Sequence, residues 1–398
     1  MLDMEEESES VMARVLLISR ISLGHGNGGG MEVSLQSLAT LLTLSGHRVS
    51  LLTTPGIVRQ DMMQVFENAW LIRGARPGKY SMRWWLGSFR HSQAHLWKPD
   101  IVVSISSAGS AFLLGNSSLT HVAQCHGTAL AEVKSSLRTG GLREYAKVAL
   151  NCARIVREVL AYKAFREVWA VSDEVSKQLL NFPYTVSKSR LVVISNGVDV
   201  DRFKFDLNAR ASLRRQLGID EGVSVGITLS RLHSQKGVDK AILSLAQPGS
   251  SHHVLIVTGD GGELVSLERL ARDAGVSDRV HFVGHLDTVS VSTYLSAADI
   301  LVFPTMRVEG LPLSLLEALA SGLSVVTSRG CNVPVDLQKC VSIVDTTPAA
   351  VAKGWQQAVS ESAGSPAERL SLLPGRFGAA HMAEMYLDGV VRVIRHSV

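Results

Sequence analysis

The chain has 398 residues, of which 46% are hydrophobic and 19% charged, with 34 glycines and a formal net charge of +4. This length suits two domains with a core each, and the composition suits a soluble α/β protein. A membrane-spanning protein is not expected, because no stretch approaches the roughly 18 consecutive apolar residues that a crossing helix needs. We also expect no signal peptide, since the first residues lack a basic start and an apolar core.

The chain start and the cysteines support two further expectations. Five acids and no base lie within the first ten residues, so we expect residues 1–12 to form a disordered acidic tail and the remaining chain to be basic. The four cysteines lie far apart and form no C-x-x-C pair, which predicts a reducing cytoplasm and no zinc site.

Short apolar runs predict strands in the first half of the chain. Residues 13–19 predict the first strand, a glycine-rich loop follows, and residues 31–44 have helical spacing. Further strands are expected up to Thr53 and over residues 101–105, 168–171 and 191–194. Strands that alternate with helices are typical of a doubly wound sheet.

The glycine-rich loop allows two interpretations. Gly24, Gly26 and Gly29 fit G-x-G-x-x-G between a strand and a helix, the pattern of a dinucleotide site. Such a site needs an acidic residue after the second strand to hold a ribose, and Thr53 and Thr54 stand there instead. A tight turn is the plain structural alternative, and it is compatible with either role. A nicotinamide-dependent oxidoreductase is therefore an alternative that lacks its ribose carboxylate.

Two basic segments follow in the first half. Residues 68–98 hold six bases, no acid and four of the chain's six tryptophans, and residues 134–166 hold eight bases and two acids. Bases with interfacial aromatic residues are typical of a surface that contacts an anionic membrane. Alternatively, the tryptophans pack inward and the charges are solvated. We expect no nucleic acid partner, because no nucleic-acid-binding motif accompanies the charge.

A second series of strands follows a polar segment. Residues 201–218 are charged and show no strand pattern, so we expect a linker there. Five apolar runs then predict strands, over residues 224–229, 253–258, 280–283, 300–303 and 324–327. Two Rossmann-like domains that face a cleft are expected, residues 13–205 and 206–376. Residues 377–394 have the spacing of a helix that buries one face.

Arg231 and Lys236 follow the first strand of the second half. Two cations five residues apart at the C-terminal end of a strand can converge on a diphosphate and stabilise its charge. Ordinary surface charge is the alternative. The position before Gly237 and Asp239 favours the diphosphate.

Glu309 and Glu317 lie in a segment whose other residues have the apolar pattern of a buried helix. Residues 297–305 predict a strand, and Gly310 and Pro312 predict a loop and a first helical turn. The start of a helix at the carboxyl edge of a sheet binds anions, so the phosphates of a sugar nucleotide could bind there while the two carboxylates accept hydrogen bonds from its hydroxyls. A charge at a helix start plus an incidental helix glutamate is the alternative.

Together these motifs resemble those of the retaining glycosyltransferases of family 4, which have the GT-B fold. Glu309 and Glu317 match the E-x7-E motif of that family, and residues 231–239 match R-L-x-x-x-K-G-x-D, with Ser230 where glycine is usual. The resemblance runs from about Ala13 to about Ile394. Its other matches are Gly29, Gly30 and Glu32, His126 and Gly127, and Asn196 to Asp199 with Phe203.

The resemblance implies roles for these residues. Glu309 would contact the donor sugar and Glu317 the ribose, while His126, which could otherwise be a structural histidine, would lie near the anomeric centre. The catalytic residues implied are His126, Arg231, Lys236 and Glu309. The donor-binding residues implied are Gly29, Gly30, Arg231, Lys236, Gly284, Leu286, Glu309, Gly310, Leu311, Pro312, Leu313 and Glu317. Residues 377–398 would form a helix that returns to the N-terminal domain.

We expect no cofactor and no metal. Asp199 and Asp201 spell D-x-D, a pattern that holds a divalent metal in a different fold. The cations and the helix start would already neutralise the leaving group, so we interpret this D-x-D as coincidence.

These features predict a retaining hexosyltransferase that moves a sugar from a UDP- or GDP-sugar to an acceptor hydroxyl. The acceptor would be lipid-linked or a saccharide, in the synthesis of a cell-surface polysaccharide or glycolipid. The expected location is the cytoplasm, peripheral on the cytoplasmic face of the membrane. An inactive sugar-nucleotide-binding partner protein is the alternative.

Overall fold

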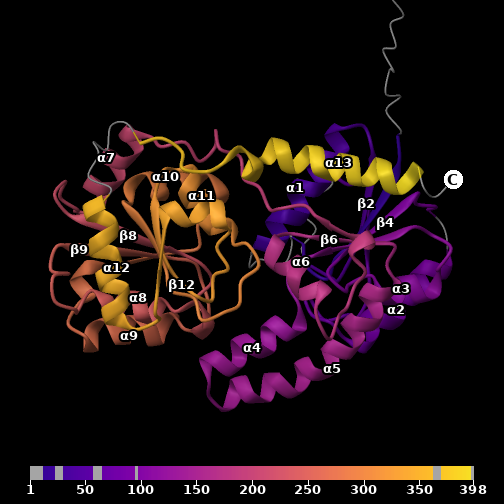
Figure 1. Ribbon diagram of the computed structural model, residues 1–398, viewed down its shortest axis with the longest axis horizontal. Coiled ribbons are helices and arrows are strands. Elements are labelled where there is room, and N and C mark those ends of the chain that lie inside the picture. The colour runs from indigo at the N-terminus through magenta and orange to yellow at the C-terminus, as the bar shows by residue number, and fades with distance from the viewer. Residues whose placement is uncertain (1–11, 23–29, 57–64, 95–96, 362–368, 396–398) are drawn as a thin grey trace, which may run out of the picture.

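The computed structural model describes residues 12–22, 30–56, 65–94, 97–361 and 369–395, and these form two parallel sheets with helices around each (Figure 1). The expected acidic tail lies outside the described residues, apart from Met12, and so does Gly29. The two sheets confirm the expected architecture of two Rossmann-like halves, although β3 and β13 at their edges were not predicted.

The first sheet has seven strands in the order β3-β2-β1-β4-β5-β6-β7. All its pairings are parallel. Strands covered on both faces are runs of apolar residues, as Val15 to Ile18 of β1 are, because neither face of such a strand meets water. Its strands are β1 Arg14–Ile18, β2 Arg48–Thr53, β3 Asn68–Leu71, β4 Ile101–Ile105, β5 His121–Cys125, β6 Glu167–Ala170 and β7 Leu191–Val193.

The second sheet has six parallel strands in the order β10-β9-β8-β11-β12-β13. In both sheets the strand order reverses beside the first strand of the series, β1 or β8, so the loops at the carboxyl ends of the strands open a crevice there. Its strands are β8 Ser224–Leu229, β9 His253–Thr258, β10 Val280–Gly284, β11 Ile300–Phe303, β12 Ser324–Ser328 and β13 Val341–Val344.

Helices cover both sheets, and their bounds are as follows. The first half contains α1 Gly30–Leu44, α2 Met82–Ala94, α3 Ser110–Gly115, α4 Ala129–Thr139, α5 Leu142–Ala164 and α6 Asp173–Leu180. The second half contains α7 Leu207–Gln216, α8 Val238–Ser244, α9 Leu264–Asp273, α10 Thr288–Ala297, α11 Leu313–Ala320 and α12 Pro348–Glu361. Short 3-10 helices include η4 Ser234–Lys236 and η8 Gly375–Phe377.

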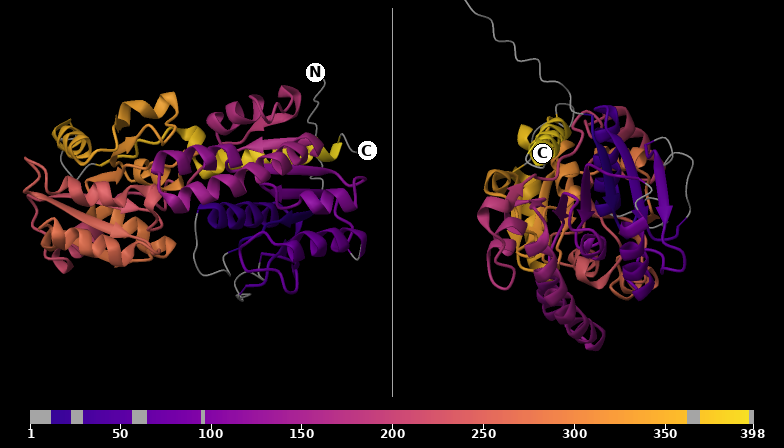
Figure 2. Two further views of the ribbon diagram at one scale, coloured as in Figure 1. Left: turned by 90° about the horizontal axis from the view of Figure 1, so that it is seen from below. Right: turned by 90° about the vertical axis from the view of Figure 1, so that its right-hand side faces the viewer.

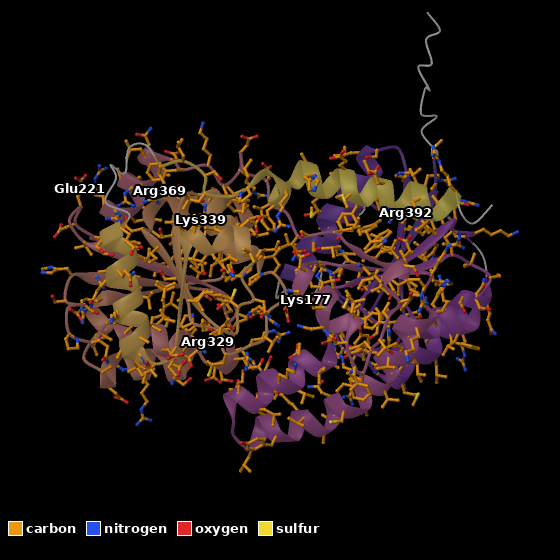
Figure 3. The ribbon with its side chains drawn as sticks, in the orientation of Figure 1. Lys177, Glu221, Arg329, Lys339, Arg369 and Arg392 are labelled. Carbon is orange, nitrogen blue, oxygen red and sulfur yellow. The ribbon has the colours of Figure 1, made fainter. Side chains whose placement is uncertain are left out.

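The last helix, α13 Ala379–Arg395, lies across the first half, as the resemblance implied (Figure 1). Met382, Tyr386, Val390 and Val393 are buried in the core of the first sheet, together with residues of β1 and α1. Arg392, labelled in Figure 3, forms an ion pair with Glu167 of β6 at 2.9 Å. The end of the chain is therefore part of the N-terminal domain.

The expected linker is half helix. Asp206 caps α7 by accepting hydrogen bonds from the amides of Asn208 and Ala209, and two arginines of the helix, Arg210 and Arg214, are buried rather than solvated. Arg210 and Arg214 each donate to Asp299, at 2.7 Å and 2.6 Å. From the sequence alone this charged segment without a strand pattern was predicted to be a linker, because nothing in it shows that its arginines pair with Asp299.

The tryptophans of the first basic segment pack inward. Trp84 is fully buried, and Trp70, Trp85 and Trp97 pack against the same core. The alternative of inward packing is thus what the structure shows, and no exposed belt of tryptophans supports a membrane surface in residues 68–98.

Candidate active site

The site lies where the loop after β11 meets the loop after β8. Lys236, the last residue of η4, donates to Glu309 Oε1 at 2.7 Å, and Thr305 Oγ1 donates to the same oxygen at 3.2 Å. Arg307 Nε stands 3.7 Å from Glu309 Oε2. The backbone is fixed as well, because Asn332 Nδ2 donates to the Glu309 carbonyl at 2.8 Å. The predicted cation and carboxylate therefore meet directly.

Glu309 is ionised in this setting. Burial by itself would raise the pKa of the carboxyl, but the charges of Lys236 and Arg307 and the hydrogen bonds from Lys236 and Thr305 hold that pKa below its usual value. Glu309 is only 9% exposed. A buried carboxylate with its cations in place is a fixed hydrogen-bond acceptor for a hydroxyl.

Arg231 and Lys236 line one pocket of about 200 Å³ between the two halves. The second half contributes Arg231, His233, Lys236 and Arg307. The first half contributes Lys147 and Asn151 of α5 and Glu132 of α4. Three of the four permanent cations pair with carboxylates, Lys236 with Glu309, Arg307 with Glu132 and Lys147 with Glu144. Together with Arg231 they leave one positive charge in excess, which suits an anionic ligand.

Glu317 lies five residues into α11 and away from this carboxylate–lysine pair. Burial raises the pKa of its carboxyl to about 7, and the only opposing charge is that of Arg202. Pro312 precedes the helix and no side chain caps it, so the first amides of α11 are available to a ligand. The two glutamates therefore differ in charge state near neutral pH.

His126 follows β5 and reaches the loop that carries Glu309. A Cβ at Gly310 would lie 3.1 Å from the His126 carbonyl oxygen, so the two segments approach closely and any larger residue here would be tightly packed. The His126 ring bonds Gln124 Oε1 through Nε2 at 3.1 Å, and Gln124 in turn bonds the hydroxyl of Tyr386. Burial lowers the pKa of His126 to about 4. The ring is thus neutral at pH 7.

Other predicted donor residues also come from facing segments. A Cβ at Gly30, the first residue of α1, would lie 3.7 Å from Leu313 of α11. Asn196 Nδ2 donates to the Leu311 carbonyl at 2.9 Å, across the two halves. The start of α1 at Gly30 and the helix of the E-x7-E motif therefore face each other across the two halves.

Gly284 and Leu286 belong to another part of the second half. Gly284 has a positive φ of 72° at the end of β10 and accepts a hydrogen bond from the Gly259 amide at 2.7 Å. Asp260 lies beside it, with Oδ1 3.8 Å from a Cβ placed at Gly284. Leu286 packs on the core of the second half. These residues contact neither Lys236 nor Glu309.

Sequence reasoning missed the contacts that join the two halves. Arg307 donates from both terminal nitrogens to Glu132 of α4, with Nη1 3.0 Å from Oε2. Gln235 Nε2 donates to Glu144 of α5 at 2.9 Å. Arg307 alone carried a signal, as a cation two residues before Glu309, whereas Glu132 and Glu144 look like ordinary helix charges.

No group of three or more His, Cys, Asp or Glu side chains gathers as metal ligands within the described ranges. In the same ranges, none of the helices combines the length and apolar character that a bilayer crossing requires.

Comparison with known proteins gives one family match for each half. The model described as glycosyl transferases group 1 matches residues 209–369, and the model described as glycosyltransferase family 4 matches residues 28–202.

Curated relatives match over different lengths. A "GDP-mannose-dependent alpha-(1-6)-phosphatidylinositol monomannoside mannosyltransferase" of Mycobacterium tuberculosis is 36% identical over 36% of this chain and 39% of its own length. A "D-inositol 3-phosphate glycosyltransferase" of Corynebacterium kroppenstedtii is 27% identical over 92% of this chain and 87% of its own. The chain thus spans about two fifths of the length of its more similar relative.

Solved structures share the fold over nearly the whole chain. Sucrose-phosphate synthase of Thermosynechococcus elongatus has a TM-score of 0.77 at 18% identity and covers 97% of this chain and 100% of its own. HepE of Anabaena, in complex with UDP and glucose, has a TM-score of 0.75 at 17% identity and covers 95% and 99%. With one family model on each half and this arrangement of two sheets, the chain belongs to the family 4 glycosyltransferases of GT-B fold.

Proposed function

We propose that the protein is a retaining glycosyltransferase that moves a sugar from a nucleoside-diphosphate donor to an acceptor hydroxyl. The observation that carries the proposal is the Lys236–Glu309 pair at 2.7 Å, beside a pocket that Arg231, Lys147 and Arg307 also line. A carboxylate for sugar hydroxyls and cations for a diphosphate lie within one cleft, as sugar transfer from such a donor requires.

Each residue then has a step to perform. Arg231 and Lys236 stabilise the diphosphate as its bond to the anomeric carbon breaks. When Lys236 turns to the diphosphate, Glu309 is released to accept hydrogen bonds from the sugar. The acceptor oxygen attacks from the face that the diphosphate leaves, and its proton passes to the departing phosphate oxygen. This front-face route retains the anomeric configuration and needs neither a nucleophile nor a metal from the protein.

His126 and Glu317 position the two ends of the donor. Neutral His126, held by Gln124, accepts or donates a hydrogen bond near the anomeric centre and is not a general acid at pH 7, because burial lowers its pKa to about 4. Glu317 lies on α11 one turn beyond the free amides and accepts from the ribose hydroxyls. We therefore expect Glu309 to control turnover and Glu317 to control nucleotide affinity.

The donor is a UDP- or GDP-sugar. A mannosyltransferase relative carries GDP-mannose in its name, and HepE was solved with UDP and glucose, so both bases occur among similar proteins. The acceptor is a lipid-linked or saccharide hydroxyl of a glycolipid or polysaccharide. We place the enzyme in the cytoplasm on the support of four unpaired cysteines. Its position at the membrane face is part of the same proposal and follows from a lipid-linked acceptor.

Thermal unfolding in the presence of UDP-, GDP- and ADP-sugars tests the proposal. A true donor at one hundred times its Kd stabilises the folded chain by about 2.7 kcal/mol. NMR of the product's anomeric proton then reports retention. NAD serves as the control ligand. Stabilisation by NAD alone would contradict the proposal, and donor binding without hydrolysis or transfer would indicate an inactive sugar-nucleotide-binding partner protein.

A further inference from the structure

Helices α4 and α5 form a hairpin that projects from the first half (Figures 1 and 2). The two helices pack along each other, and their inner side reaches the second half through Glu132–Arg307 and Glu144–Gln235. The opposite side of the hairpin has no partner within the described residues. That outer side carries an unusual distribution of apolar and charged residues.

The outer face of α5 is hydrophobic along most of its length. Between Leu142 and Leu160, every exposed residue with a described side chain is hydrophobic, and these residues recur with the helical period at positions 142, 145, 146, 149, 150, 152, 153, 156 and 160. Leu142 is 90% exposed, Leu150 76% and Val156 62%. A helix of a soluble domain normally buries such a stripe, so this face is built to be covered.

The acids of the hairpin are all turned inward. Glu158 is fully buried and accepts from the Ala129 amide at 2.7 Å and from Arg154 at 2.8 Å. Glu144 is 5% exposed and bonds Ser136 and Gln235. Glu132 forms an ion pair with Arg307. The outer face therefore carries no described carboxylate that would repel an anionic surface.

The exposed charges of the hairpin are basic. Lys134 and Arg138 lie one turn apart on α4 and flank exposed Leu137, while Lys163 and Arg166 lie at the far end of α5. A hydrophobic stripe bounded at both ends by bases is the pattern of a helix that lies in the interface of an anionic membrane. The 19 residues from Leu142 to Leu160 span about 27 Å, which is enough for the helix to lie flat on that interface.

We propose that the outer face of α5 (Leu142 to Leu160), with the bases that flank it, docks the protein on an anionic lipid surface. A second copy of the chain is a poorer occupant, because a two-fold contact through this face would bring the same bases of both copies together. This docking proposal rests on the proposed function, because docking would bring the enzyme to a lipid-linked acceptor. Lys147 and Asn151 on the inner side of α5 line the pocket, so a docked α5 separates the lipid from the site by one helix diameter.

Co-sedimentation of the full chain with vesicles tests this docking. We expect binding to phosphatidylcholine vesicles that contain phosphatidylglycerol, weaker binding to pure phosphatidylcholine, and loss of affinity as salt rises. Leu150→Gln with Val156→Gln should weaken binding at least tenfold, because the immersed apolar area is lost. Lys134→Gln with Arg138→Gln should weaken it about fivefold per base at low salt.

The matched control is Val265→Gln with Val289→Gln, two valines of the second half that are 75% and 71% exposed. This control should bind vesicles like the unchanged protein. Any of three results would overturn the docking proposal. The Leu150/Val156 variant could bind vesicles as tightly as the unchanged protein, or the unchanged protein could bind both kinds of vesicle equally. The third result is that the unchanged protein is a dimer which only the Leu150/Val156 variant dissociates. Stabilisation by a donor sugar, and transfer to a water-soluble acceptor, should be the same in all these variants. If vesicle binding is as expected but no nucleotide sugar binds, the proposed function fails and the docking surface stands.

Discussion

Lys236 and Glu309 neutralise each other in the unliganded site, so each depends on the other until a donor arrives. Lys236→Met removes the cation from the diphosphate and also leaves Glu309 with the more distant Arg307 as its cation. We expect kcat to fall about 100- to 1,000-fold, the usual cost of one lost donor to a developing negative charge. Steady-state transfer or donor hydrolysis measures it.

Lys240→Met is the control for this variant. Lys240 also pairs with a carboxylate, Asp239 at 3.1 Å, but it lies on α8 and does not line the pocket. Its kcat should be unchanged. If Lys236→Met kept full turnover, the assignment of this pocket to the diphosphate would be wrong.

Glu317 makes stability depend on pH in the direction opposite to most carboxyls. Its pKa is raised by burial to about 7 in the folded chain and is near 4.5 when unfolded, so the folded state holds an extra proton between these values. This contribution is present below about pH 4.5 and is lost as pH rises through about 7, and it amounts to at most about 3 kcal/mol. Glu317→Gln should flatten the fall of the unfolding temperature between pH 5 and 7, measured without nucleotide.

The same substitution should weaken nucleotide binding while kcat changes less, because the ribose stays on the part of the donor that leaves. Glu309→Gln provides the contrast. The pKa of Glu309 is held low, so its contribution to stability is present at neutral pH and is lost on acidification. A pH profile in Glu317→Gln identical to that of the unchanged protein would show that this carboxyl is not buried as described.

Helix α7 is held to the second half by charge rather than by an apolar stripe. Asp299 accepts from Arg210, Arg214 and the Val225 amide at 2.6–2.8 Å, and Arg369 approaches it at 3.6 Å. Asp299→Asn leaves these arginines without their carboxylate, and we expect it to destabilise the second half by about 3 kcal/mol. Hydrogen exchange in β8 to β13 and the urea midpoint measure the loss.

The exposed pair Arg269–Asp273, at 3.4 Å, supplies the control. Asp273→Asn removes a carboxylate from one arginine at the surface and should change stability by less than about 1 kcal/mol. Equal effects of the two substitutions would mean that the Asp299 cluster is no better than a surface pair.

The elements differ in how far sequence could predict them. The strands β8, β9 and β11 were predicted to the residue, since a strand buried on both faces is an apolar run with sharp ends. Helix α7 was taken for a linker because two of its three buried residues are arginines, and their partner, Asp299, lies 89 and 85 positions away. The inward packing of the tryptophans could not be chosen from composition either, since a core tryptophan and an interfacial one have the same neighbours in sequence.

The site residues also differ in how far the sequence could predict them. Lys236 and Glu309 were predictable because a local motif fixes each one beside the end of a strand. Arg307–Glu132 and Asn196–Leu311 were not, because they exist only once two separately folded halves meet. Motifs thus indicate what a site binds, and the contacts between halves determine whether its parts stand together.

Helix α13 ties the two halves of the molecule together, because it follows the second half in sequence but belongs to the core of the first. Tyr386 is 1% exposed, packs edge-on against Trp169 with ring centroids 5.8 Å apart, and bonds Gln124, the residue that holds His126.

Tyr386→Ala should lower the free energy of unfolding by about 3–5 kcal/mol through the cavity it leaves. Since the cavity lies in the first half, hydrogen exchange should accelerate in β1 and β4 to β6 and stay unchanged in β8 to β13. Tyr145→Ala, at an exposed tyrosine of the first half, should alter neither set. Faster exchange in the second half would instead mean that α13 stabilises the domain that precedes it in sequence.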